Sequence, residues 1–325
     1  MAASMSALVL ETPRYPELNL LVYDSNGHLL AALEIPTTQQ AQYITEEMLC
    51  RYCWLVFIFP NQNEWAIYKL QANNTPDTTA LQHDSASLVS PGNYVVLDLN
   101  HAPITIDLTP NYAPRRVRTQ SADSQSQGQR EWSRLQNKFR DSLRTRDAAC
   151  AITGPNAIAS RRSPFRGLEA THIFPVSKVD EWRRNQYRRY ITDTRPSSEI
   201  GESGLYSPQN GLLLRSDIHI HFDAFEIGID ADADYKIIVF VPDTTGIGGT
   251  RLRNSALSGT LRVSANLLRW HLRMCLYKHL KANAEPQTEW EEDLGEDPMG
   301  EILSQPDAAE RMEVELFTRL GELIE

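Results

Sequence analysis

Three short segments in the middle of the chain combine histidine, asparagine and carboxylate side chains. The first contains His172, the second contains Asn210, and the third contains His219 and Asp223. A histidine at the end of a strand can take a proton from water, because its ordinary pKa is about 6.5. A histidine and a carboxylate four residues apart on a helix share one face and can hold a divalent ion with open positions for water and phosphate. Residues of these types can activate water and hold a divalent ion, which are the two requirements of phosphodiester hydrolysis.

The sequence around these residues resembles the HNH nucleases, and most closely the HNH domain common in fungal proteins. The resemblance covers roughly residues 148–245, and its motifs are Cys-Ala-Ile-Thr-Gly from Cys150, Ala-Thr-His-Ile-Phe-Pro around His172, Asn-Gly-Leu-Leu-Leu from Asn210 and His-x-x-Phe-Asp from His219. It implies a ββα-metal fold and an endonuclease that depends on a divalent ion, Mg²⁺ or Mn²⁺. It also implies that His172 is the general base, that Asn210 braces the loop between two strands, and that His219 is a metal ligand on the helix.

Two positions near the implied general base bear on how the metal is bound. Thr171 stands where many HNH enzymes have an Asp or His that binds the metal, and a threonine is a poor ligand. Asp223 is a substitute ligand for that position. Glu169 lies on the same side of an extended segment as Thr171, so it is placed either to reach the ion or to orient His172. His221 is an alternative to His219 as the ligand, although its position fits the family pattern less well.

The net charge of −10 hides an uneven distribution along the chain. Residues 111–221 hold 19 basic and 11 acidic residues, whereas residues 1–110 hold 3 and 11, and residues 222–325 hold 10 and 20. The basic section contains the His-Asn-His segments, and 37 residues separate His172 from Asn210. We expect the arginines of this insert to bind the phosphates of nucleic acid, DNA rather than RNA. They are Arg183, Arg184, Arg188, Arg189 and Arg195.

Cysteine content and hydropathy exclude two classes of protein. Four cysteines in 325 residues do not make a disulfide framework, and the longest apolar run, near Trp54–Phe59, is too short to cross a bilayer. The N-terminus has no basic stretch followed by an apolar one, so it does not resemble a secretory signal. Cys50 and Cys53 have the spacing of half a zinc site, but without a second pair they indicate core packing. We expect an intracellular protein, in the nucleus or the cytoplasm, without a membrane partner.

The pattern along the chain predicts an α+β protein in four parts. Residues 1–110 form a β-rich α+β domain, with strands over 18–23, 29–35, 53–59, 65–70, 94–99 and 104–108 and a helix over 37–51. Residues 111–130 are a linker rich in Gln and Ser. Residues 131–283 are the HNH nuclease-like domain with flanking helices, over 131–149 and 264–281. Residues 284–325 are an acidic segment followed by a helix over 307–323.

Two further hypotheses stand beside the nuclease. The chain is alternatively a nucleic-acid-binding or regulatory protein that keeps the HNH fold without efficient catalysis, because Thr171 occupies a ligand position. The N-terminal domain is alternatively a module that recognises a protein partner or a target and directs the nuclease to it. Nothing in residues 1–110 names that target.

Overall fold

A five-stranded sheet forms the first part of the molecule. The computed structural model describes residues 7–38, 40–61, 64–114, 127–155 and 162–282. Within these residues the strand order of the sheet is β2-β1-β6-β4-β5, with β1 parallel to β6 and the other neighbours antiparallel. The sequence predicts all of these strands except β5, whose Pro-Asp-Thr-Thr-Ala sequence has no large apolar or aromatic residue. They are β1 (Leu20–Tyr23), β2 (Leu29–Leu33), β4 (Ala66–Leu70), β5 (Pro76–Ala80) and β6 (Gly92–Leu97).

The helix of this part begins later than predicted. Helix α1 covers Glu46–Val56, and the hydroxyl of Thr45 caps it by accepting a hydrogen bond from a backbone amide of the first turn. The predicted start at residue 37 is therefore wrong, because the cap that satisfies the free amides of a helix start is Thr45. Cys50 and Cys53 are free thiols on the buried side of α1, as the core-packing interpretation predicts.

The apolar run at residues 53–59 is mostly helix rather than strand. Only Phe57–Ile58 remain extended, as β3, which pairs with β7 (Asp107–Leu108). Burial on one face of α1 explains the apolar run equally well, because a short apolar stretch does not by itself distinguish a strand from a buried helix.

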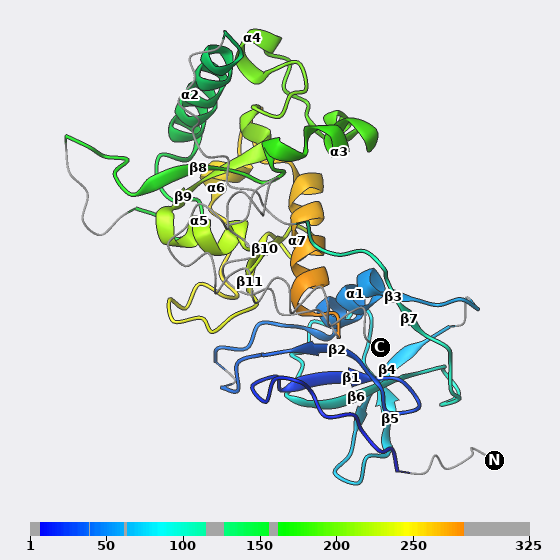
Figure 1. Cartoon of the computed structure of the whole chain (residues 1–325). Coiled ribbons are helices and arrows are strands. Elements are labelled where there is room, and N and C mark those ends of the chain that lie inside the picture. Colours follow the sequence, from blue (N-terminus) through cyan, green and yellow to red (C-terminus); the bar gives the residue numbers. More distant parts are fainter. Residues whose placement is uncertain (1–6, 39, 62–63, 115–126, 156–161, 283–325) are drawn as a thin grey trace, which may run out of the picture.

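The second part of the molecule holds a two-stranded hairpin with helices around it (Figure 1). A second two-stranded sheet, β10 with β11, lies beside helix α7. The predicted helices over 131–149 and 264–281 correspond to α2 and α7, and the mixed α+β class is confirmed. The elements are α2 (Gln127–Asp147), β8 (Leu168–His172), η1 (Val176–Lys178), α3 (Val179–Arg184), η2 (Tyr187–Tyr190), α4 (Ser197–Ile200), η3 (Pro208–Asn210), β9 (Gly211–Arg215), α5 (Ser216–Asp223), β10 (Ile227–Asp230), β11 (Lys236–Val239), α6 (Asn254–Leu257) and α7 (Ala265–His279).

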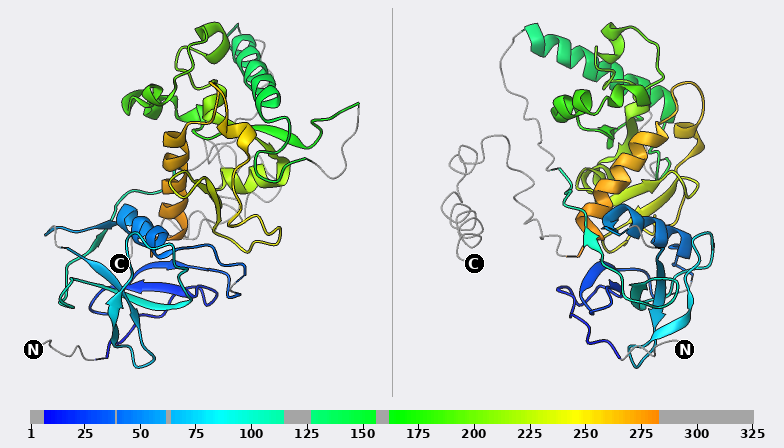
Figure 2. Two further views of the ribbon diagram at one scale, coloured as in Figure 1. Left: turned by 180° about the vertical axis from the view of Figure 1, so that it is seen from behind. Right: turned by 90° about the vertical axis from the view of Figure 1, so that its right-hand side faces the viewer.

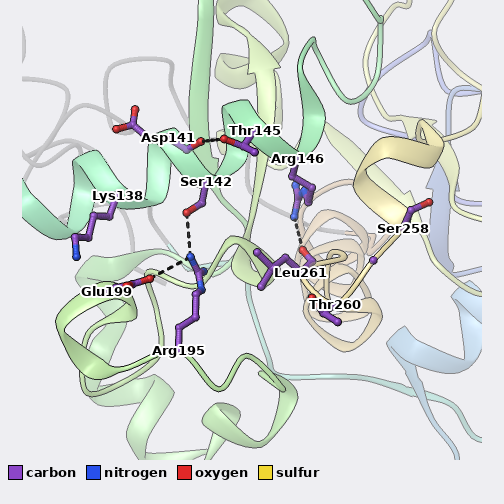
Figure 3. Close-up of a pocket in the computed structure, with 11 residues that line it drawn as sticks. Lys138, Asp141, Ser142, Thr145, Arg146, Arg195, Glu199, Ser258, Thr260 and Leu261 are labelled. Carbon is purple, nitrogen blue, oxygen red and sulfur yellow. Dashed lines mark hydrogen bonds and ion pairs between the residues drawn. The ribbon is translucent and has the colours of Figure 1, made fainter.

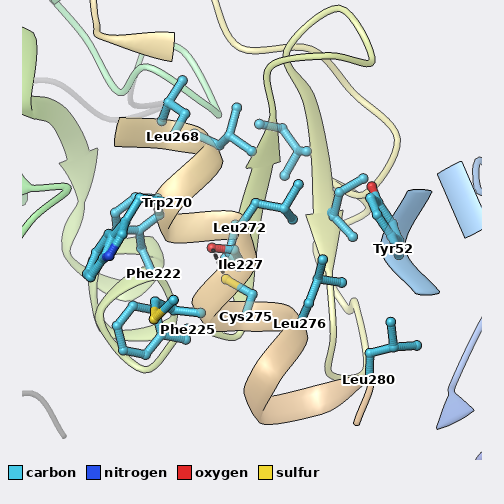
Figure 4. Close-up of a cluster of buried hydrophobic side chains, with 14 of the residues drawn as sticks. Tyr52, Phe222, Phe225, Ile227, Leu268, Trp270, Leu272, Cys275, Leu276 and Leu280 are labelled. Carbon is cyan, nitrogen blue, oxygen red and sulfur yellow. Dashed lines mark hydrogen bonds between the residues drawn. The ribbon is translucent and has the colours of Figure 1, made fainter. Parts of the chain in front are cut away.

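Helix α7 joins the two parts through a shared core. Its buried side chains pack against β10, against Phe222 of α5 and toward Tyr52 of α1 (Figure 4). Just after the helix, Lys281 forms an antiparallel bridge with Ala31 of the edge strand β2. One hydrophobic cluster among the described residues therefore extends from the N-terminal sheet to the second part. Figure 2 shows α7 between the two parts from two further directions.

A buried ion pair adds to this junction. Arg51 of α1 donates hydrogen bonds of 2.9 and 2.8 Å to the two carboxylate oxygens of Asp230, which ends β10. The hydroxyl of Tyr52 donates a third bond to Asp230, at 2.7 Å. Since Asp230 is fully buried, these donors are what compensate for its removal from water. The N-terminal sheet is thus held in place by specific contacts as well as by the covalent chain.

Some predicted elements fall outside the described residues. They are the acidic segment at 284–298, the helix at 307–323 and most of the linker, at 115–126. Across the ranges that the structure does describe, no helix is both long enough and apolar enough to cross a membrane.

Candidate active site

Three consecutive elements carry the predicted site residues. Strand β8 pairs antiparallel with β9, with His172 opposite Gly211, and α5 begins directly after β9. Helices α2 and α5 both pack against this hairpin, which lies between them in Figures 1 and 2. Because side chains alternate along a strand, Glu169 and Thr171 share one face of β8 and His172 lies on the other. Glu169 meets α5 and His172 meets α2.

The imidazole of His219 lies between two carboxylates. Its Nδ1 is 2.6 Å from Oε2 of Glu169, and its Nε2 is 3.1 Å from Oδ2 of Asp223. Glu169 comes from β8, whereas Asp223 follows His219 by one turn of α5. The hairpin and the helix thus bring Glu169 to within hydrogen-bonding distance of His219, which follows it by 50 positions in the sequence.

The two carboxylates set the protonation of the ring. Burial lowers the pKa of His219, but the hydrogen bonds and charges of Asp223 and Glu169 outweigh burial and raise the pKa above 6.5. The hydrogen bond from His219 lowers the pKa of Glu169 in turn. Glu169 is therefore ionised at neutral pH and accepts the Nδ1 proton. A carboxylate on Nδ1 favours the neutral tautomer with its proton on Nδ1, in which Nε2, beside Asp223, carries the lone pair that can bind an ion.

His172 ends β8 and is held by aromatic rings. Its imidazole stacks on Phe139 of α2, with ring centroids 3.9 Å apart and an angle of 6° between the planes. Tyr206 meets the imidazole edge-on, with centroids 5.6 Å apart. These two rings fix the orientation of His172, and a general base needs a fixed orientation toward the proton it removes.

Gly211 allows this stacking. A Cβ on Gly211 would lie 2.3 Å from Cζ of Phe139 and 2.8 Å from the carbonyl oxygen of Thr171. The Phe139 ring approaches the backbone at this position because glycine has no side chain. The glycine of the Asn-Gly-Leu-Leu-Leu motif therefore has a packing reason beside His172, and Phe139 is a supporting residue that the sequence alone did not identify.

Asn210 is fully buried and bonds to backbone groups on both sides of the insert. Its Oδ1 accepts a hydrogen bond of 2.9 Å from the Phe174 amide. Its Nδ2 donates to the carbonyl oxygens of Phe174 and Leu205, at 3.1 and 3.0 Å. The backbone carbonyl of Asn210 also accepts a bond from the Ile173 amide. These bonds fasten the chain that leaves β8 to the chain that enters β9.

Gln209 and Asp193 form a second set of hydrogen bonds that hold the insert in place, and the sequence did not indicate them. Oε1 of Gln209 accepts from the amides of Thr192 and Asp193, at 2.7 and 3.1 Å. The carboxylate of Asp193 accepts from the hydroxyl of Ser207 and from the guanidinium of Arg195. An amide beside the motif asparagine and an acid beside a threonine are common in surface loops, so their sequence signal is weak.

Thr171 and His221 do not join the His219 cluster through any contact that the structure gives. Thr171 is 1 % exposed, and its hydroxyl is buried without a hydrogen-bond partner in the described part of the chain. The Nδ1 of His221 is 2.6 Å from Oε2 of Glu226, and the side chain is 49 % exposed. His221 is therefore directed elsewhere, which favours His219 over His221 as the ligand.

Four arginines of the insert are exposed, namely Arg183, Arg184, Arg188 and Arg189. Arg183 and Arg184 are exposed on α3, and the ion pair of Arg183 with Asp180, at 3.4 Å, lies at the surface. Arg189 is exposed on η2, where it stacks over the ring of Tyr190 and donates to its hydroxyl. These side chains are accessible to a phosphate backbone.

Arg188, although exposed, and Arg195 also donate hydrogen bonds to groups of the protein itself. Arg188 donates to the carbonyl oxygens of Ile191 and Asp193, at 2.7 and 3.4 Å. Arg195 forms a fork with the carboxylate of Asp193 and also donates to the hydroxyl of Ser142. The expectation that all five arginines bind phosphate therefore needs correction, because the guanidinium of Arg195 is already held by a carboxylate.

A cavity of about 640 Å³ lies beside α2 and α4, lined also by residues 258–261 (Figure 3). Its arginines are Arg146 and Arg195, and both are bonded to protein groups. None of its lining residues belongs to β8 or α5. The site is therefore defined by the hairpin and α5 rather than by this cavity.

Comparison with known families identifies the segment that carries these residues. Residues 150–230 match the model of a family described as HNH endonuclease. Residues 150–230 form an HNH domain. No curated protein and no solved structure gives a significant match to the chain. The family supports a nuclease-type domain that acts on nucleic acid, and its members generally use a divalent metal ion.

The HNH domain offers two neighbouring donors to such an ion. Nε2 of His219 and Oδ2 of Asp223 are 3.1 Å apart, close to the separation of two adjacent ligands whose bonds are about 2.1 Å long. Glu169 is at the opposite nitrogen and does not share that position. Among the described residues, no group of three or more His, Cys, Asp or Glu side chains has the arrangement of a metal site. Two donors fit an ion such as Mg²⁺, which keeps several waters and binds substrate phosphate.

Proposed function

We propose that this chain is a divalent-metal-dependent HNH endonuclease that hydrolyses phosphodiester bonds of nucleic acid, DNA rather than RNA. The observation that carries the proposal is the placement of His219, with Glu169 on Nδ1 and Asp223 at 3.1 Å from Nε2. That placement presents a histidine nitrogen and a carboxylate side by side on the face of β8 that carries Glu169, while His172 ends the same strand and lies on its other face against α2. The family match at residues 150–230 supports this reaction class.

His172 acts as the general base in this proposal. It takes a proton from water as the water oxygen forms a bond to phosphorus and the bond from phosphorus to the leaving oxygen breaks. The stacked ring of Phe139 and the edge of Tyr206 orient His172. Asn210 has a positioning role, since its hydrogen bonds fix the chain on both sides of the hairpin.

His219 and Asp223 would hold the ion, Mg²⁺ or Mn²⁺, and Glu169 would keep His219 in the required tautomer. When bound, such an ion neutralises charge on the phosphate and on the leaving oxygen. Arg183, Arg184 and Arg189 contact the phosphate backbone, with Arg188 in a smaller part because it also binds carbonyl groups.

Cleavage of a supercoiled plasmid tests this proposal. We expect wild-type protein to nick the plasmid with Mg²⁺ or Mn²⁺ and not with EDTA, and we expect His172→Ala to lose at least a hundredfold in rate. His221→Ala is the matched control, because His221 lies on the same helix and bonds to Glu226 instead. Equal cleavage by wild type and His172→Ala contradicts the assignment. A labelled RNA of the same sequence, tested in parallel, decides between DNA and RNA.

A second candidate function is nucleic-acid binding without efficient catalysis. It is favoured by Thr171, whose hydroxyl is buried at the position where many HNH enzymes have a metal ligand. Calorimetric titration with Mn²⁺ distinguishes the two functions. Heat of binding that disappears in His219→Ala supports the nuclease, whereas no binding together with salt-dependent DNA affinity supports the second function.

A further inference from the structure

Three aromatic rings form a nearly parallel group on the N-terminal part. Trp54 of α1 lies 5.9 Å from Phe59 and 6.0 Å from Trp65, measured between ring centroids, with angles of 23° and 8° between the planes. Phe59 and Trp65 are 5.0 Å apart at 16°. We call Trp54, Phe59 and Trp65 the aromatic platform. Because the planes are nearly parallel, the rings present flat faces in one direction.

The platform is open to solvent at one end. Trp54 is 59 % exposed and Ile58, between Trp54 and Phe59 in the sequence, is 43 % exposed, whereas Trp65 is only 8 % exposed. A large exposed tryptophan on a rigid helix loses little entropy on binding and offers a large contact area. Trp65 anchors the group to the core, so the platform is held in place before any partner arrives.

Three exposed carboxylates are neighbours, in the sequence or across a strand pair, of platform residues or of residues next to them. Glu64 precedes Trp65, Asp107 pairs in register with Ile58, and Asp84 follows His83, whose ring meets Trp65 edge-on at 5.2 Å. All three carboxylates are exposed. None has a hydrogen bond or an ion pair within the part of the chain that the structure describes.

The surrounding charge disfavours a phosphate ligand. Residues 1–110 hold three basic residues, Arg14, Arg51 and Lys69. Arg51 is bound to Asp230, and Lys69 bonds to Ser90. A nucleic acid that stacked its bases on the platform would bring its phosphates to a part of the chain with 11 acidic and 3 basic residues. An arginine or lysine side chain fits both features, because it is attracted to the face of a tryptophan and to carboxylates.

We propose that the aromatic platform binds an arginine-bearing basic segment of a partner protein. A guanidinium lies flat on Trp54, and neighbouring cations of the same segment pair with Glu64 and Asp107. This surface is separate from the HNH domain at residues 150–230 and does not depend on catalysis there. The partner that we propose for the N-terminal part is therefore a cationic peptide segment.

The indole N–H resonances of the full-length protein test this proposal, with ¹⁵N-labelled tryptophan and a hexa-arginine peptide as the probe. The resonance of Trp54 is assigned by its absence in Trp54→Phe. We expect it to shift with saturation, while that of Trp182, which is buried, stays in place. We expect Glu64→Gln combined with Asp107→Asn to raise the Kd read from Trp54 about three- to tenfold. Glu34→Gln, another exposed acid of the same part, leaves that Kd unchanged.

Binding is measured at the Trp54 resonance because a chain of net charge −10 attracts any polycation, wherever on the surface it binds. A Trp54 resonance that stays in place while the peptide binds elsewhere overturns the proposal. A Trp54 resonance that shifts with a dT hexamer and not with the peptide overturns it in favour of base stacking. An equal Kd in the double carboxylate variant also overturns it, because the carboxylates then have no part in recognition.

Discussion

Replacement of Asn210 by alanine is the sharpest test of how the hairpin is held. The side chain is fully buried, and it makes one hydrogen bond as acceptor and two as donor, all to backbone groups. Asn210→Ala leaves the Phe174 amide and the carbonyls of Phe174 and Leu205 without these partners. Each buried polar group left unpaired costs about 1–3 kcal/mol. Allowing for relaxation and water entry, we expect a loss of about 3–6 kcal/mol in the free energy of unfolding.

Urea denaturation followed by circular dichroism measures this loss, with Asn100→Ala as the matched control. Asn100 is exposed and its side chain makes no hydrogen bond that the structure gives, so its replacement should change stability by less than about 0.5 kcal/mol. Nicking activity is measured on the same samples below the unfolding transition. A loss below about 1 kcal/mol for Asn210→Ala, with cleavage abolished, refutes the bracing role and indicates that Asn210 acts in the chemistry.

Asn210→Asp sharpens the same test through its pH dependence. At neutral pH an ionised carboxylate would face the carbonyl oxygens of Phe174 and Leu205 and lack the two donors, so the variant should be at least as unstable as Asn210→Ala. Its folded-state pKa would then be raised above the value of about 3.9 found in unfolded chains, and protonation restores one donor. We therefore expect part of the lost stability to return as pH falls below that raised pKa, and a flat profile contradicts this account.

Three further outcomes follow from the site. Glu169→Gln should weaken Mn²⁺ affinity or cleavage about 10- to 100-fold, because the carboxylate that fixes His219 is lost, and calorimetry together with plasmid nicking checks this. Gly211→Ala should destabilise the protein by about 1–3 kcal/mol in urea, because its Cβ would lie 2.3 Å from Phe139. Burial raises the pKa of Asp193, but hydrogen bonds from Arg195 and Ser207 lower it overall. Its contribution to stability is therefore present above pH about 3.9 and lost as pH falls through the folded-state pKa, so Asp193→Asn should flatten the urea midpoint between pH 5 and pH 3.

Local patterns in the sequence were sufficient for much of the fold. Apolar, β-rich runs bounded by turn residues located β1, β2, β4 and β6, and helical spacing located α2 and α7. The spacing of His219 and Asp223 predicted one helical face, and their side chains lie 3.1 Å apart. These features depend on residues close together in the chain, which is why spacing alone predicts them.

Features that depend on contacts between distant residues could not be predicted from local sequence patterns. The contact of Glu169 with His219 joins two elements 50 residues apart, and the sequence left open whether Glu169 meets the ion or His172. Phe139 supports His172 from α2, and no local pattern distinguishes it from an ordinary core residue. Arg195 is a different case, since its partner Asp193 is only two residues away, but its charge alone made it resemble a phosphate ligand. Helix α1 was misplaced because the cap, Thr45, was not recognised.

The most direct test of the central claim is the position of a bound ion. Anomalous scattering from crystals soaked in Mn²⁺ locates the ion without reference to activity. We predict one peak within bonding distance, about 2.0–2.3 Å, of both Nε2 of His219 and a carboxylate oxygen of Asp223, with Glu169 still bonded to Nδ1. A peak bound to Glu169 or to His221 instead, or no peak on α5 in crystals of protein that nicks DNA with Mn²⁺, contradicts the account.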